Sequence, residues 1–224
     1  EWLRHLRLSA IAEGGALPLS RAAADLPGAT RLAADGVLRR RPNGGGPLFD
    51  GRLRAVSDDP AGLRAWAWGA GWAPESLVLS GDLAVEGGRI GLNRLALGVG
   101  PVRLGGALAV ELSEAAVRVE GRLAGNGAEA DLDARWADGR PTGRLALSTT
   151  NLAATTRAWD LPYRPAGAVP ARLSARLSPA EGGAVALDDL RLDSGATTVS
   201  GTGVLRLGAQ PHLDATLAAG DLVL

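Results

Sequence analysis

The sequence predicts an all-β protein, mostly antiparallel and with few short helices, from three observations. Segments in which apolar and polar residues alternate recur along the chain, and a period of two is typical of strands with one buried and one wet face. Turn-forming pairs such as Asn126-Gly127 and Asp138-Gly139 separate these segments. The chain also resembles itself. We therefore expect irregular β-repeats that build an elongated curled sheet, an open repeating β-groove.

The alternation is clearest at residues 77–87, where leucine and valine occupy one face and Ser80, Asp82 and Glu86 the other. The same pattern predicts strands at 102–112, 116–122, 128–136, 169–177, 185–192, 197–207 and 213–217.

Two short helices interrupt the predicted strands. The first is expected near 58–68, because a Ser-Asp-Asp capping sequence precedes a proline that suits the first turn. The second is expected near 150–160, which has a similar composition and ends before a Leu-Pro pair. Residues 18–27 are interpreted as a further helical turn or an irregular loop.

The internal repeat is visible without gaps. A shift of 95 residues lays 90–112 on 185–207, and Gly100 and Gly106 then meet Gly195 and Gly201. A shift of 167 lays 28–39 on 195–206, with seven of twelve positions identical. A second element recurs at 51–66 and 143–159. These matches predict an irregular β-repeat array with sub-units at roughly 1–75, 76–163 and 164–224. The chain has no methionine and begins with Glu1, so 1–224 is expected to be a single fragment of a larger repeat protein.

Composition excludes several functions. The chain has 24 basic and 24 acidic residues, so no basic footprint for nucleic acid is expected. It has no cysteine and only two distant histidines, His5 and His212, so we expect no metal and no cofactor. Glu129, Asp131 and Asp133 share a strand face, but alternation alone produces such sets. With no nucleophile elbow or phosphate-binding loop in the sequence, the chain is not expected to be an enzyme.

Two groups of residues, an arginine run and a set of tryptophans, each allow two interpretations. The arginine run 39–41 suits a phosphate or lipid headgroup, although a solvated strand end is the commoner role. The tryptophans at 66, 68 and 72 suit a membrane interface or the mouth of a groove. Their helix-like spacing favours instead a plug that packs a short helix onto the sheet.

Together these features resemble the AsmA family of Gram-negative envelope proteins. The stretches LALGVGPVRLGGALAV and LRLDSGATTVSGTGVLRL look like its strand–Gly–strand repeat, and FDGRLRAVSDDPAGLRAWAWG looks like its strand followed by a short helix ending in aromatics. PHLDATLAAGDLVL is similar to the close of a unit. The resemblance covers most of the chain from about residue 16. It implies a half-pipe sheet with an apolar concave face, in a periplasmic protein whose parent is anchored in the inner membrane by a helix outside this chain.

The function expected on this basis is non-enzymatic. An apolar groove would conduct phospholipids between the inner and outer membrane, with acyl chains as ligands and inner- and outer-membrane proteins as candidate partners. The alternative is a scaffold module with a closed β core that supports outer-membrane protein assembly. Abundant alanine and glycine on the apolar face leave space, which favours the open groove. The candidate lining residues are Leu79, Leu83, Val85, Leu104, Leu108, Val110, Val117, Val119, Leu132, Val199, Leu205 and Leu207.

Overall fold

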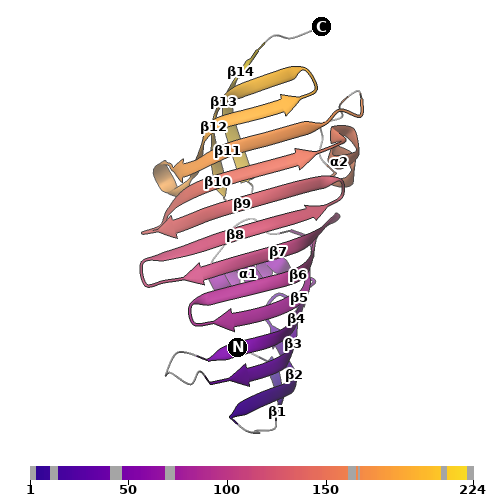
Figure 1. Ribbon diagram of the computed structural model, residues 1–224, viewed down its shortest axis with the longest axis vertical. Coiled ribbons are helices and arrows are strands. Elements are labelled where there is room, and N and C mark those ends of the chain that lie inside the picture. Colours follow the sequence, from indigo (N-terminus) through magenta and orange to yellow (C-terminus); the bar gives the residue numbers. More distant parts are fainter. Residues whose placement is uncertain are drawn as a thin grey trace. The chain divides into compact units, whose positions relative to one another are not determined.

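The computed structural model describes residues 4–10, 15–40, 47–68, 74–160, 165, 167–207 and 211–220. The chain divides into two compact units, Glu1–Glu111 and Leu112–Leu224, and each is described by itself (Figure 1).

The first unit is an antiparallel meander in which each strand pairs with the next strand along the chain. One α-helix lies between its fourth and fifth strands. The elements are β1 (Arg4–Ala10), β2 (Ala16–Leu26), β3 (Thr30–Arg39), β4 (Leu48–Ser57), α1 (Pro60–Trp68), β5 (Leu77–Glu86), β6 (Arg89–Val99) and β7 (Val102–Leu112).

The second unit repeats this plan, with a helix after its third strand. Its elements are β8 (Ala116–Gly125), β9 (Ala128–Ala137), β10 (Arg140–Thr149), α2 (Leu152–Ala158), β11 (Ala171–Pro179), the 3-10 helix η1 (Glu181–Gly183), β12 (Val185–Ser194), β13 (Thr197–Leu207) and β14 (Pro211–Ala219).

The predicted fold class is confirmed. In each unit the described strands form a curled antiparallel sheet that is open, because its first and last strands do not pair with each other (Figure 1). Both predicted helices are present, as α1 and α2. The division into sub-units at 1–75, 76–163 and 164–224 stays a prediction.

The interpretation of residues 18–27 as a helical turn or loop was wrong. These residues lie almost entirely in β2 (Ala16–Leu26). The register of β2 against β3 shifts between Leu19 and Ala22, and this irregularity breaks the period of two that would have marked the strand. Pairing along the whole of β3 outweighs the helix propensity of the three consecutive alanines.

In the first unit, the segment that leads into the helix docks on a hairpin turn. The backbone N–H of Asp59, just before α1, donates to the carbonyl of Gly28 in the turn between β2 and β3, at 3.0 Å. Behind this contact the hydroxyl of Thr30 donates to the hydroxyl of Ser57 at 2.8 Å, and both residues are buried. The buried hydroxyl pair thus ties the end of β4 to the turn that receives the helix.

The second unit uses the same device with different residues. The Thr149 hydroxyl donates to the carbonyl of Gly127 in the turn between β8 and β9, at 2.7 Å, and also lies 2.7 Å from the hydroxyl of Thr155 in α2. Asn151 caps the helix by accepting from the N–H of Ala154. The predicted repeat of 51–66 and 143–159 therefore corresponds in both units to a strand that turns into a docked helix.

The repeat by 95 residues extends to a bulge. Arg94 in β6 and Asp189 in β12 both have a positive φ, 48° and 49°, in strands where the register against neighbouring strands shifts. Each forms an ion pair with the preceding strand, Arg94 with Asp82 and Asp189 with Arg176. The residue at the bulge is the arginine in the first unit and the aspartate in the second, while the positive φ and the ion pair to the preceding strand are the same in both. Such bulges raise the local twist and help a sheet to curl.

Candidate functional site

The strands of the first unit place their apolar residues on one face. Side chains of directly paired residues lie on the same side of a sheet, so the register defines the faces. Across β5, β6 and β7 the register produces three apolar rows. These rows are Leu79–Leu97–Leu104, Leu83–Leu92–Leu108 and Val85–Ile90–Val110.

All six lining residues predicted in the first unit therefore share this face, which we call the apolar face. The middle residue of each row, on β6, was not among the predicted lining residues; these are Leu97, Leu92 and Ile90. They could have been identified, because the repeat had already aligned β6 with β12. The face continues across β4 through Phe49, Leu53 and related positions that pair with the β5 residues.

The second unit has an equivalent apolar face. Val117 pairs with Trp136, Val119 with Ala134, and Leu132 with both Gly121 and Leu145. Further along the unit, the remaining candidates continue this face: Val199 pairs with Leu192 and Leu205 with Val185. The last candidate, Leu207, is the final residue of β13, and its side chain lies outside the described part of the structure.

Burial differs between the two apolar faces. Among the described residues of the first unit, Ala24, Leu92 and Leu95 are the only buried hydrophobic side chains, and the six candidates are half-buried. The second unit instead contains a packed cluster around Ala134, Leu177, Val185, Leu187 and Leu190.

Two candidates of the second unit, Leu132 and Leu205, pack against this cluster. At the β8–β9 end of the same face, Val117 and Trp136 are 36% and 37% exposed, values that are high for large apolar side chains in a sheet. The first unit thus offers a half-buried apolar face, and the second an apolar face that is filled at its centre and exposed at the Val117–Trp136 pair.

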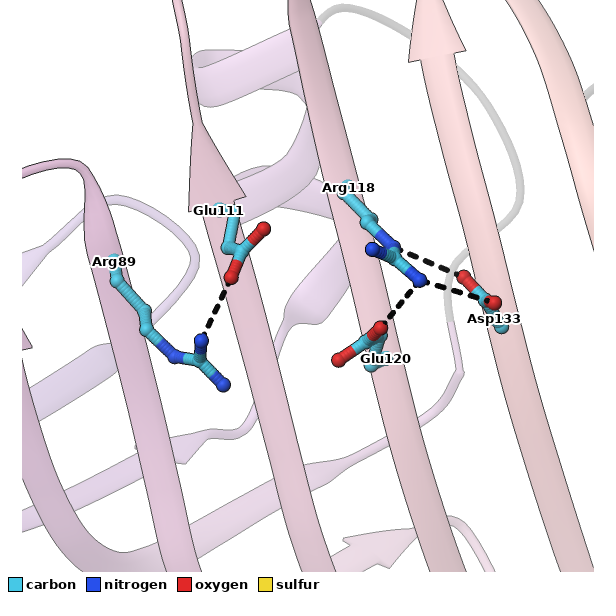
Figure 2. Close-up of polar contacts among 5 residues, drawn as sticks. All are labelled: Arg89, Glu111, Arg118, Glu120 and Asp133. Carbon is cyan, nitrogen blue, oxygen red and sulfur yellow. Dashed lines mark hydrogen bonds and ion pairs between the residues drawn. The ribbon is translucent and has the colours of Figure 1, made fainter.

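The opposite face of each sheet is lined by ion pairs. Figure 2 shows Arg89 of β6 reaching Glu111 of β7 at 2.7 Å in the first unit. In the second unit Arg118 contacts Glu120 at 2.6 Å and reaches across to Asp133 on β9 at 3.2 Å (Figure 2). These side chains are largely exposed, so each pair contributes at most about 1 kcal/mol to stability.

The pKa shifts on this face follow from the same pairs. The hydrogen bond from Arg191 holds the pKa of the Asp193 carboxyl below its ordinary value, and a second bond from the Thr198 hydroxyl acts in the same direction. Arg206, followed by His212, lowers the pKa of Asp214 in the same way. Ionised, paired carboxylates of this kind are suited to a water-facing surface.

The other sequence candidates form no reactive arrangement in the described part of the chain. Asp131 and Asp133 are ion-paired with arginines of β8. His5 and His212 each contact a neighbouring aspartate. Within the described ranges no three His, Asp or Glu side chains gather as a metal site would require.

The arginine run and the tryptophans lie partly or wholly outside the described residues. In the run 39–41, Arg39 ends β3 and Arg40 follows it, while residue 41 lies outside the described residues. The side chains of all three tryptophans at 66, 68 and 72 also lie outside them. The described helices are too short to cross a bilayer.

Comparison of the chain with protein-family models, with curated proteins and with solved structures finds no match in any of the three.

Proposed function

We propose that the chain is a non-enzymatic lipid-binding segment whose apolar sheet face receives the acyl chains of phospholipids. The observation that supports this most is the half-buried apolar face of the first unit, where three rows of leucine, isoleucine and valine cross β5, β6 and β7. Incompletely buried apolar side chains in such number, on one face of a sheet, favour a binding surface.

Binding would rest on the burial of acyl chains against side chains that form no directional bonds. Each methylene of an acyl chain that leaves water contributes about 0.8 kcal/mol. Aliphatic side chains make no directional bonds, so an acyl chain can slide along the rows at little cost. Headgroups stay in water at the rim, and no chemical step is required. This is the property expected of a conduit for phospholipids between two membranes of a cell envelope, in a periplasmic segment of an anchored parent.

The scaffold alternative is favoured by a different observation. The second unit buries a cluster of six residues, Ala134, Ala175, Leu177, Val185, Leu187 and Leu190. A filled centre of this kind suits a structural module better than a continuous conduit.

The test uses two variants of adjacent residues on β5. Leu79 lies on the apolar face, whereas Val78 lies on the opposite face and is 38% exposed. The proposal predicts that Leu79→Asp loses most binding of a fluorescent fatty acid while Val78→Asp keeps it, because only the first places a charge among acyl chains. A third variant, Leu79→Trp, blocks the row without a charge and should also lose binding. Equal binding by the wild type and all three folded variants would refute the proposal.

A further inference from the structure

The polar face of the first unit contains a hollow of ≈ 730 Å³ that the lipid proposal does not use. Residues of β2, β3, β4, β5 and β6 line it, so it lies wholly within one unit. Its volume falls in the range typical of small-molecule sites, about 300–1,000 Å³.

Arginines outnumber carboxylates in this hollow. Four line it, Arg21, Arg52, Arg54 and Arg94, against two aspartates, Asp35 and Asp82. Both aspartates are already neutralised by an arginine. Arg52 donates to Asp35 through Nε at 3.2 Å and through Nη2 at 3.0 Å, and Arg94 is paired with Asp82. The hollow therefore carries a net charge of +2, four positive minus two negative groups.

The two remaining guanidinium groups have space around them. Neither Arg21 nor Arg54 forms an ion pair with another described residue, and both are exposed. Arg54 pairs with Ala33 on β3 and with Ser80 on β5. The short side chains of these two residues leave open space on either side of Arg54. Small neighbours beside long arginines are what create the hollow.

From this arrangement we infer that the hollow binds a small ligand carrying several phosphate charges. A guanidinium presents N–H donors in a rigid fork that matches phosphate oxygens, and a phosphate has acceptors on several sides that more than one fork can reach. The lining spans five strands, about 19 Å at ~4.8 Å per strand, so the site suits a ligand with two or more phosphates better than a single phosphate. This inference is independent of lipid binding on the apolar face.

The test is isothermal titration calorimetry of the whole chain with inorganic tripolyphosphate, monophosphate and citrate. We expect one molecule of tripolyphosphate to bind, at least about tenfold tighter than monophosphate and tighter than citrate, a carboxylate of similar charge. The variant Arg21→Gln/Arg54→Gln should weaken tripolyphosphate by about tenfold or more.

The matched control is Arg135→Gln/Arg172→Gln, which removes two exposed arginines from the polar face of the second unit. It should leave the affinity within about twofold of wild type. Equal weakening by both double variants would show unspecific attraction and overturn the inference, as would citrate binding as tightly as tripolyphosphate.

A second arm identifies the source of the phosphates by co-sedimentation with phosphatidylcholine vesicles, with or without cardiolipin, a lipid that carries two phosphates. Binding to cardiolipin vesicles that is lost in Arg21→Gln/Arg54→Gln supports a lipid headgroup as the ligand. Tripolyphosphate binding without vesicle binding supports a soluble phosphorylated molecule. Binding to neither would overturn the inference.

Discussion

Gly28 should be indispensable for docking the segment that leads into α1, and its replacement by alanine tests how the helix is held. The residue has φ +74°, and a Cβ added there would lie 2.2 Å from the carbonyl oxygen of Asp59 and 2.4 Å from the backbone nitrogen of Leu63. Both atoms belong to backbone and cannot move unless the chain around the start of α1 moves. The control is Gly87→Ala, because Gly87 also has a positive φ, +59°, but has nothing within 4 Å of its added Cβ.

The expected magnitudes differ by the cost of that displacement. Both variants place alanine in the left-handed region, at about 1–2 kcal/mol, offset in part by a stiffer unfolded chain, which returns about 0.4–1 kcal/mol. Gly28→Ala also breaks the 3.0 Å bond from Asp59 to Gly28 and disturbs the buried pair of Thr30 and Ser57. At about 1 kcal/mol for each hydrogen bond, its total is about 3 kcal/mol.

The assay is urea unfolding monitored by circular dichroism. The free energies of unfolding are compared between variants that share the same dependence on urea concentration, the m value. Gly87→Ala should lose about 1 kcal/mol or less and Gly28→Ala about 3 kcal/mol. If both variants lose the same amount, the close approach of the turn to the segment before α1 does not contribute to stability, and the reasoning is refuted.

Two further predictions concern the ion pairs. Arg191 lowers the pKa of the Asp193 carboxyl in the folded chain. The stability that this ion pair contributes is therefore present above the ordinary carboxyl pKa and is lost as the pH falls through the lowered value. Asp193→Asn should make the free energy of unfolding fall less steeply with pH on the acid side, and an unchanged dependence on pH would contradict this. In the second unit the aspartate lies at the bulge and the arginine on the preceding strand. Arg94→Asp should therefore lower the midpoint of urea unfolding slightly, because it brings two carboxylates together, and Asp82→Arg/Arg94→Asp should restore most of that loss. A double variant no more stable than the single one would contradict this exchange of charges.

Alternation in the sequence predicted β5, β7, β8, β9 and β11 to β14. The first helix followed from its capping sequence, and the second from a similar composition that ends before a Leu-Pro pair. The prediction failed at residues 18–27 because a bulge shifts the period and alanine favours neither face. The gapless shift of 95 residues was informative enough to superpose the bulges at Arg94 and Asp189, although their opposite charges conceal the match. Most of the fold could therefore be predicted from the local alternation of residues and from the internal repeat.

Two features of the sites could not be predicted in this way. The alternation of apolar and polar residues is the same for an apolar face that is covered and for one that is open. The sequence therefore could not show that the rows of the first unit are half-buried while the centre of the second is filled, because this difference depends on how each sheet curls. The basic hollow depends on the register of five strands, which brings Arg21 and Arg54 into one site from residues 33 positions apart in the sequence.

The central claim, that the apolar face binds phospholipid, is tested most directly by native mass spectrometry with lipid extraction, on the chain purified from bacterial membranes or periplasm. The account predicts phospholipid bound at defined stoichiometry, and its loss in a folded variant with Leu104→Asp and Val199→Asp, one substitution on the apolar face of each unit. A folded wild-type chain that carries no phospholipid and takes up no fluorescent acyl probe would contradict the claim and favour the scaffold reading.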